Sequence, residues 1–591
     1  MRVFPQKRSV MTKKSVFTFK GFDRRLKSSE KAFREMTNMS GMEKNCVSVR
    51  GKRGFMDMEA NEIYSMVSTD VLIDGVIREN AFIVDTGNRL KAFYYEAGVL
   101  KRKDIMNTTS FTTGKNKMIT SGGYLYFFPD KKYINLMNTR ESGSLEATVD
   151  LNAGTTETAT GTYFYETTLV STDQTGKNNT ADSGYIRIRS ERCKDLNGVK
   201  GDHVNYHNFA VKFRVGDTVK LEGAPEGDGL HRIVYIPDDY SYIVVRGVLS
   251  GSNVTADGIV TVSRNVPDMD YVVAAGNRLW GCRYGVNDNG EPVNEIYASA
   301  QGDAKNWNTF DGVSTDSYVA SVGQDGVFTG AVVYQGDPLF FKEDAVIRVY
   351  GSVPSDFTIL TSNIRGIEKG SSDSAVIVND TLYYKTYSGI VAYSGGMPYN
   401  VDGELGDVRY SEAVAGCLRE RYYVSLKNAD GEYELLVYDT ENESWYREDT
   451  TRVRNFCRCG DELYMLTGEE GQASVVTVFG SGNAGCEDEV CWECVTGDLG
   501  TDVSYRKYVT RLEVRIQPLE STLINVDISY DGEDVWHRVG EFSDTSRLIS
   551  VPVIPRRCHS YRLKLWGTGR CKILSMVRNE YICGENRKEE L

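Results

Sequence analysis

The sequence has few histidines and few prolines, and it lacks any long hydrophobic run. Only 5 His and 12 Pro occur among 591 residues, so chemistry that needs several histidines has few residues to draw on. The apolar run from Ala331 to Tyr334 is far shorter than the ~18 residues of a membrane-spanning helix. The segment from Met1 to Val16 is basic and has no apolar stretch after it. We therefore expect neither a membrane span nor a secretory signal.

Cysteine is also sparse, with 12 residues scattered along the chain. This density favours free thiols in a reducing compartment over a disulfide scaffold. Five thiols fall within one stretch: Cys457, Cys459, Cys486, Cys491 and Cys494. Only Cys491 and Cys494 have a zinc-ligand spacing, and the residues between them are not turn formers, so buried thiols are favoured over a metal site. His203 and His207 lie four apart among poor helix formers, which favours two loop histidines. We expect no cofactor.

The residues that are abundant indicate an all-β protein. There are 57 Gly, 36 Tyr and 22 Phe, and 40% of the chain is hydrophobic, which is enough for a buried core. The net charge is −13, yet residues 1–53 hold 15 Lys and Arg against 4 Asp and Glu. The rest of the chain is strongly acidic, unlike a domain that grips nucleic acid. The basic arm is either a solvated tail or a docking segment for an acidic neighbour or a nucleic acid.

The only segment with a helical pattern lies within this arm. Ser28, Ser29 and Glu30 can cap a helix, and Ala32, Phe33, Met36 and Met39 then form one apolar stripe. We expect the stripe to pack on this or a neighbouring subunit. The candidate docking residues of the arm are Arg24, Arg25, Phe33, Met36, Arg50 and Arg53.

A turn motif repeats along the chain, in which Gly or Asn and a polar residue precede Leu and an aromatic residue. Its seven copies begin at Gly87, Gly122, Gly276, Gly336, Asn379, Arg419 and Gly460. The last three intervals are 43, 40 and 41 residues, close to the length of a propeller blade. Such corners between β-branched and aromatic runs predict β-hairpins. We therefore expect a β-propeller of six or seven blades, with a β-sandwich of coincidental spacing as the alternative.

The intervals also define the expected domains. The long interval between the second and third copies indicates an inserted β-barrel or β-sandwich at 145–263, with propeller residues at 56–144 and 264–485. Residues 1–55 form the basic arm. The strict alternation of 512–516, 524–530 and 561–565 predicts a half-solvated antiparallel sheet. Residues 486–591 are therefore expected to form a C-terminal β-sandwich.

No catalytic motif stands out. The sequence lacks a Gly-x-Ser-x-Gly elbow, a phosphate-binding loop and a His-Glu-x-x-His pair. The segment from Ser529 to Trp536 resembles the Asp-box turn of sialidase propellers, but its Gly comes one place early and it occurs once. We predict that the chain is not an enzyme. Trp492, Trp536 and Trp566 are candidates for carbohydrate recognition if they are exposed on the sandwich, and for core packing if they are not.

Several segments resemble the tail-nozzle and tail-hub proteins of short-tailed bacteriophages. They are 19–23 (Phe-Lys-Gly-Phe-Asp), 36–39 (Met-Thr-Asn-Met), 49–54 (Val-Arg-Gly-Lys-Arg-Gly), 307–311, 339–343, 347–351, 365–371, 511–512 and 555–558. The similarity covers most of the chain outside the insert, and its motifs are diffuse.

The resemblance implies a virion structural protein, in which a hexameric ring or tube lies below the portal and adaptor and lets double-stranded DNA pass at ejection. Such a protein would assemble in the bacterial cytoplasm. An acidic channel wall would repel phosphate and let the DNA slide. Two other functions stay open: a glycan- or receptor-binding tail component that uses the C-terminal sandwich, and a glycosidase, which would need converging carboxylates in a pocket.

Overall fold

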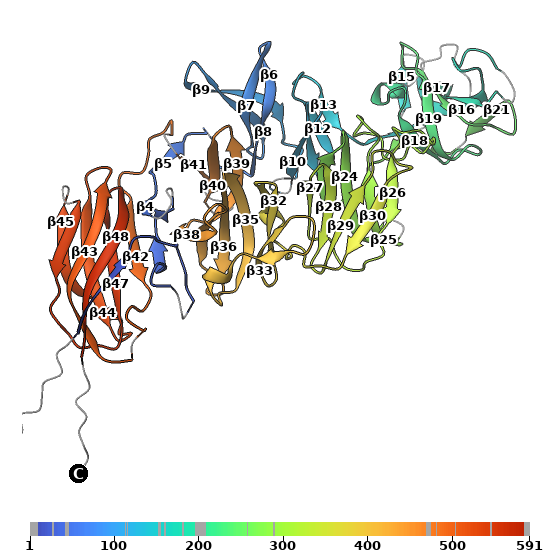
Figure 1. The fold of residues 1–591 in the computed structure, drawn as a ribbon. Coiled ribbons are helices and arrows are strands. Elements are labelled where there is room, and N and C mark those ends of the chain that lie inside the picture. Colours follow the sequence, from blue (N-terminus) through green and yellow to red (C-terminus); the bar gives the residue numbers. More distant parts are fainter. Residues whose placement is uncertain are drawn as a thin grey trace, which may run out of the picture.

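The computed structural model describes residues 10–583 except 26–28, 42–45, 59, 113, 115, 152–154, 159–160, 180–182, 196–207, 257, 288–289, 469–473, 480–481, 503 and 544–546. These residues form an all-β protein whose helical elements are the 3₁₀ turns η1 (Phe209–Lys212), η2 (Ser372–Ser374) and η3 (Gly403–Leu405). In this part of the chain no helix is long and apolar enough to cross a membrane. A propeller lies in the middle, with the inserted domain at one end and the sandwich at the other (Figure 1).

The propeller consists of four-stranded antiparallel sheets, of which the described residues form seven. We number these blades 1 to 7 in chain order. Blade 1 contains β6 (Ser65–Ile73), β7 (Val76–Asp85), β8 (Arg89–Glu96) and β9 (Val99–Asn107). Blade 2 contains β10 (Lys117–Ser121), β11 (Tyr124–Phe128), β12 (Lys132–Asn135) and β13 (Ser142–Ser144). Blade 3 contains β23 (Tyr271–Ala275), β24 (Arg278–Val286), β25 (Pro292–Ala298) and β26 (Tyr318–Ser321).

The remaining blades repeat this order. Blade 4 contains β27 (Gly330–Tyr334), β28 (Asp337–Lys342), β29 (Ala345–Tyr350) and β30 (Thr358–Ser362). Blade 5 contains β31 (Val376–Val378), β32 (Thr381–Thr386), β33 (Gly389–Tyr393) and β34 (Tyr399–Asn400). Blade 6 contains β35 (Tyr410–Leu418), β36 (Arg421–Asn428), β37 (Tyr433–Asp439) and β38 (Ser444–Asp449). Blade 7 contains β39 (Val453–Cys459), β40 (Glu462–Thr467), β41 (Val475–Phe479) and β5 (Arg53–Met56).

The first strands of the blades are the inner strands of a ring. β10 contacts both β6 and β23, β23 contacts β27, and β35 contacts both β31 and β39. The contact between β39 and β6 brings blade 7 beside blade 1. The outer strand of blade 7, β5, precedes blade 1 in the sequence and pairs with β41. Both ends of the propeller segment therefore meet in one blade, which holds the ring closed.

The repeated turn motif is the hairpin between the first and second strands of a blade. Six of its seven copies lie there, in blades 2 to 7. In blade 3 both corner residues, Gly276 and Asn277, have φ of +59°, which explains the preference for Gly and Asn at this corner. The copy at Gly87 is an exception, because it joins the second and third strands of blade 1.

The inserted domain is one antiparallel sheet of nine strands that follows blade 2. Its strands are β14 (Ala147–Asp150), β15 (Thr155–Thr158), β16 (Gly161–Ser171), β17 (Tyr185–Asp195), β18 (Thr218–Glu222), β19 (Gly229–Tyr235), β20 (Tyr242–Arg246), β21 (Asn253–Ala256) and β22 (Thr261–Arg264). Buried aliphatic side chains such as Ile188, Val219 and Val262 form its core. Thr218 donates its N–H to Asn306 Oδ1 of the β25–β26 loop over 3.0 Å, which fixes the insert against blade 3.

The sandwich combines strands from both ends of the chain. One sheet contains β1 (Val10–Val16), β3 (Met39–Ser40), β4 (Val47–Val49), β43 (Lys507–Pro518), β46 (Leu548–Pro552) and β48 (Cys571–Ile582). The other contains β2 (Phe33–Thr37), β42 (Cys491–Thr496), β44 (Leu523–Tyr530), β45 (His537–Ser543) and β47 (Tyr561–Thr568). Buried and half-buried residues alternate along β47, as expected for a sheet with one face in the core. The predicted all-β class, with a propeller, an insert and a sandwich, is confirmed.

The predicted helix of the arm is wrong. Phe33 to Thr37 form the strand β2, which pairs with β42. The strand has a register shift between Phe33 and Glu35, and this extra residue turns Phe33 and Met36 to the same side. The three-residue spacing of the buried Phe33 and Met36 is typical of one face of a helix, but here it arises from the bulge in a strand.

Candidate functional site

The candidate docking residues lie where the arm passes between propeller and sandwich. Phe33 and Met36 are each 1% exposed, and Phe33 stacks on Phe19 with ring centroids 5.3 Å apart. Arg50 and Arg53 are buried as well. Only Arg25 is half exposed, and it forms an ion pair with Asp23 over 2.8 Å.

Arg24 binds an acidic residue of blade 6. Its guanidinium donates to both carboxylate oxygens of Glu434, over 2.7 and 3.0 Å, and to Tyr410 Oη over 2.8 Å. Tyr410 Oη in turn donates to Glu434 over 2.7 Å. Burial opposes ionisation of Glu434, but the bonds from Arg24 outweigh it and lower the pKa of this carboxyl group. The bidentate geometry fixes the arm to the propeller.

Arg50 and Arg53 make equivalent contacts further along the arm. Arg50 donates to both oxygens of Glu487 over 2.6 and 2.9 Å. Arg53 lies 2.6 Å from Glu448 and 2.7 Å from Asp449, at the end of β38. The arm thus binds acidic residues of its own chain, whereas its charge pattern had left open a solvated tail, an acidic neighbour or a nucleic acid. These arginines do not form a free docking surface, because their guanidinium groups are bound within the protein.

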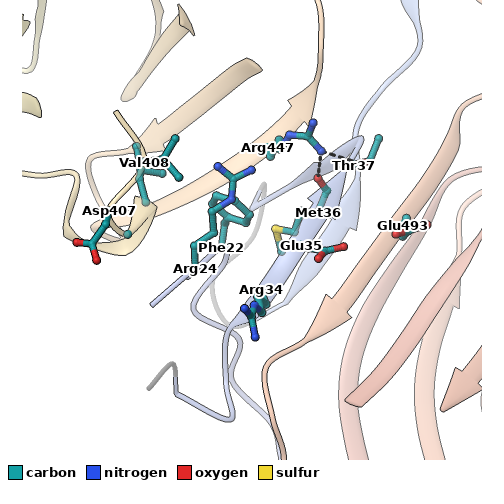
Figure 2. A pocket seen from close by; sticks show the side chains of 12 residues that line it. Phe22, Arg24, Arg34, Glu35, Met36, Thr37, Asp407, Val408, Arg447 and Glu493 are labelled. Carbon is teal, nitrogen blue, oxygen red and sulfur yellow. Dashed lines mark hydrogen bonds between the residues drawn. The ribbon is translucent and has the colours of Figure 1, made fainter. Parts of the chain in front are cut away.

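A pocket of about 580 Å³ opens beside this arm (Figure 2). Arg447 reaches into it from β38 and donates to the carbonyl of Met36 over 3.2 Å and to Thr37 Oγ1 over 3.3 Å. The charges balance, with three arginines and three acids. The lining residues are Phe22, Arg24, Arg34, Glu35, Met36, Thr37, Leu405, Gly406, Asp407, Val408, Arg447 and Glu493.

Glu493 connects this pocket with the outward face of the five-stranded sheet. It forms an ion pair with Lys564 of β47 over 2.5 Å. Trp566 lies directly opposite Glu493 in the strand register, and its indole N–H donates to Asp527 Oδ2 over 2.7 Å. Arg538 lies over the Trp566 ring, 5.0 Å from its centroid, and donates to Asp527 Oδ1 over 2.6 Å. An aromatic ring and several polar groups are therefore fixed on one surface.

Trp536 lies on the same surface, in the loop before β45. The guanidinium of Arg562 is 5.6 Å from its ring centroid, and Lys564 Nζ is 5.9 Å from it. Trp536 and Trp566 are both half-buried, whereas Trp492 is 2% exposed in the core. Two of the three candidate tryptophans thus reach the surface. We call the surface formed by Trp536, Trp566, Asn525, Asp527, Arg538, Arg562 and Lys564 the tryptophan face.

Both tryptophans are candidates from the sequence alone, but the charged residues between them are not. The available signal was the alternation along β47, where Arg562, Lys564 and Trp566 are the outward residues of a period-two strand. Asn525 and Asp527 could not be found this way. They are 2% and 7% exposed on β44, under the long side chains of the neighbouring strands.

The segment that resembles an Asp-box is the β44–β45 hairpin. Asp531 Oδ1 accepts the backbone N–H groups of His559 and Ser560 over 2.6 and 3.0 Å. Gly532 has φ of +75°, which a turn at this place requires. The hairpin therefore presents Trp536 at the edge of the tryptophan face, in the sandwich rather than in the propeller.

The cysteine cluster is divided between two domains. Cys457 and Cys459 lie on β39 of blade 7, whereas Cys491 and Cys494 lie on β42 of the sandwich. Burial raises the pKa of Cys457 to about 12. Among the described residues, no group of three or more His, Cys, Asp or Glu is arranged to hold a metal ion. His203 and His207 fall outside the described residues.

No family model and no curated protein matches the sequence. The chain is similar to solved structures of low sequence identity. A Trypanosoma rangeli sialidase is 9% identical with a TM-score of 0.22, over 96% of either chain. An endosialidase of phage phi92 is 12% identical with a TM-score of 0.21, over 72% of this chain and 69% of that one. An exo-β-1,3-galactanase from Phanerochaete chrysosporium is 10% identical with a TM-score of 0.21, over 52% and 94%.

These matches correct one prediction. We expected the chain not to be an enzyme, but the similar structures are glycoside hydrolases and sialidases, so that prediction is withdrawn. TM-scores of this size do not transfer a reaction or a substrate to the chain.

Proposed function

We propose that this protein is a glycan-binding component of a bacteriophage tail, and that the tryptophan face of its sandwich is the binding surface. The setting in a tail rests on the resemblance of the arm and the blades to nozzle and hub proteins. The binding activity rests on the tryptophan face itself.

The observation that carries the proposal is the combination of two half-exposed indole rings with fixed polar groups. The C–H faces of a sugar ring are apolar and pack on an indole ring. Its hydroxyl groups need donors and acceptors at fixed places. Lys564 and Arg538 supply donors, and the adjoining Glu493 supplies an acceptor. The ion pairs of Lys564 with Glu493 and of Arg538 with Asp527 hold these groups in position before a ligand arrives.

The spacing of the face suits an oligosaccharide. Lys564 Nζ lies 5.9 Å from the centroid of the Trp536 ring, and Lys564 is two residues from Trp566 on β47, which is a separation of about 7 Å along a strand. Lys564 therefore lies near both rings, and its ion-pair partner Glu493 also lines the pocket. A chain of several sugars would contact more of this surface than one monosaccharide.

A structural ring subunit is the second candidate function. It is favoured by the place of the residues that carry the resemblance, because Phe22, Arg50 and Arg53 are the buried residues that join arm, propeller and sandwich. A rigid joint of this kind suits a subunit that transmits force. Mass photometry at low and moderate salt tests this role: closed rings of about six subunits support it, and monomers at every salt concentration contradict it.

The binding proposal is tested by a glycan array with three proteins. The wild type should bind a subset of glycans, and the W536A/W566A variant should lose that binding. The Y350A/Y387A variant removes two exposed aromatic residues from the propeller and should bind as the wild type does. Equal binding by wild type and W536A/W566A would overturn the proposal, as would the absence of any bound glycan. Release of reducing ends from the bound glycans measures hydrolysis in the same samples.

A further inference from the structure

A second, smaller cleft lies between blades 2 and 3, at the base of the inserted domain. Two adjoining cavities of about 220 and 130 Å³ share Tyr124, Tyr126 and the loop 302–304 as walls. Each cavity alone is smaller than the usual range for drug-sized ligands, and the two together reach only its lower end. The cleft therefore admits one small ring rather than a polymer.

Three tyrosines form one wall of the cleft. Tyr124 and Tyr126 stack with ring centroids 6.0 Å apart, and Tyr133 lies opposite Tyr126 in the strand register. Burial raises the pKa of all three hydroxyl groups, so they stay protonated near neutral pH. The wall therefore combines aromatic surface with neutral hydroxyl donors.

Two cations complete the cleft. Lys305 Nζ donates to Tyr133 Oη over 2.8 Å and lies 4.1 Å from the centroid of that ring. Arg214 enters from the inserted domain and is exposed. Lys305 is half-buried, and its Nζ bonds to a tyrosine hydroxyl group rather than to a carboxylate.

The nearby acids are engaged elsewhere. Asp303 accepts from Asn306 Nδ2 over 2.7 Å and from the N–H of Lys305 over 2.9 Å. Asp217 forms an ion pair with Arg264. Burial, together with the charges of Arg214 and Arg264, lowers the pKa of Lys305 to about 8. An anion placed between Lys305 and Arg214 would relieve this repulsion.

We infer that the cleft is a binding site for a single carboxylated sugar, such as a hexuronate. The tyrosine wall packs against the sugar ring, and Arg214 and Lys305 bind the carboxylate. The site is separate from the tryptophan face and draws on different domains, so it does not depend on the function proposed above.

Titration calorimetry of the full chain at pH 7 tests the inference with D-glucuronate, D-glucose, acetate and inorganic phosphate. Glucuronate should bind at least about tenfold more tightly than glucose, because tenfold corresponds to the ~1.4 kcal/mol of one charged hydrogen bond. It should also bind more tightly than acetate, which lacks the sugar ring that packs on the tyrosine wall. The R214Q and K305M variants should each weaken glucuronate binding about tenfold. K212Q changes an exposed lysine two residues from Arg214 and should bind as the wild type does.

Each alternative has a distinct result. Acetate or phosphate binding as tightly as glucuronate would overturn the sugar site and leave an anion site. Unchanged binding in R214Q and K305M would place the ligand elsewhere. Because Arg214 is exposed, R214Q keeps the test valid if K305M does not fold. Wild-type affinity should also fall between pH 7 and 9, as Lys305 loses its proton, and K305M should lack this fall. The W536A/W566A variant should bind glucuronate normally.

Discussion

The guanidinium of Arg53, at the start of β5, lies 2.6 Å from the carboxylate of Glu448 on β38, and the two side chains are only 5% and 3% exposed. The pair joins the outer strand of blade 7 to the outer strand of blade 6. Arg53 also forms an ion pair with Asp449 over 2.7 Å. The end of the basic arm is therefore a structural part of the propeller, where its charge links two neighbouring blades.

Replacing Arg53 should strongly destabilise the protein. R53M leaves Glu448 buried without a cation, and loss of one partner of a buried pair costs about 3–5 kcal/mol. The double variant R53M/E448L should lose less than R53M, because it removes both charges. R89A, which breaks an exposed pair with Asp104, should cost less than about 1 kcal/mol. Urea unfolding of the three variants measures these differences, and equal losses for R53M and R89A would contradict the account.

The contribution of Glu434 should disappear at acid pH. Arg24 lowers the pKa of Glu434 against the opposing effect of burial, so the folded state binds a proton less readily than the unfolded state. The stability from this group is complete above the unfolded pKa of about 4.3 and is lost as pH falls through the lower folded value. The difference in unfolding free energy between wild type and E434Q should therefore shrink from pH 6 to pH 3. A constant difference over this range would contradict the assignment.

Gly21 should not tolerate a side chain. Its φ is +76°, and a Cβ atom there would lie 2.4 Å from the carbonyl oxygen of Trp445 in blade 6. We expect G21A to lose about 1–3 kcal/mol through strain and overpacking. At Gly51 a Cβ atom would meet nothing within 4 Å, so G51A is the matched control. Thermal unfolding distinguishes G21A from G51A. Equal melting temperatures would show that the arm moves to accept the new side chain with no loss of stability.

The local patterns of the sequence predicted the strands well but not their partners. The corners at Gly276 and Asn379 lie in the predicted hairpins because positive φ at a tight turn is a local requirement. The pairing of β2 with β42 joins residues more than 450 positions apart, and no local pattern encodes it. The bulge after Phe33 then gave a strand the apolar spacing of a helix. Likewise, the charge pattern left open a solvated tail, an acidic neighbour or a nucleic acid for the arm, and it did not identify Glu434 or Glu448.

Thiol reactivity should follow burial. Cys486 and Cys491 are exposed, whereas burial raises the pKa of Cys282 and Cys494 well above the usual range. Brief iodoacetamide treatment of the folded protein should therefore label Cys486 and Cys491 and leave Cys282 and Cys494 unmodified. Peptide mass spectrometry identifies the labelled cysteines. In denaturant all four thiols should react. Labelling of Cys494 in the folded protein would contradict its place in the sandwich core.

The most direct test of the proposed function is ¹⁹F NMR of protein labelled with fluorotryptophan. The chain has 6 Trp, and Trp280, Trp307, Trp445 and Trp492 are at most 3% exposed. The W536F and W566F variants assign the two remaining signals. On addition of a glycan selected from the array, we predict that the signals of Trp536 and Trp566 shift with increasing ligand and that the other four do not. Shifts confined to the four buried tryptophans, or no shift at saturating glycan, would show that the tryptophan face is not the binding surface.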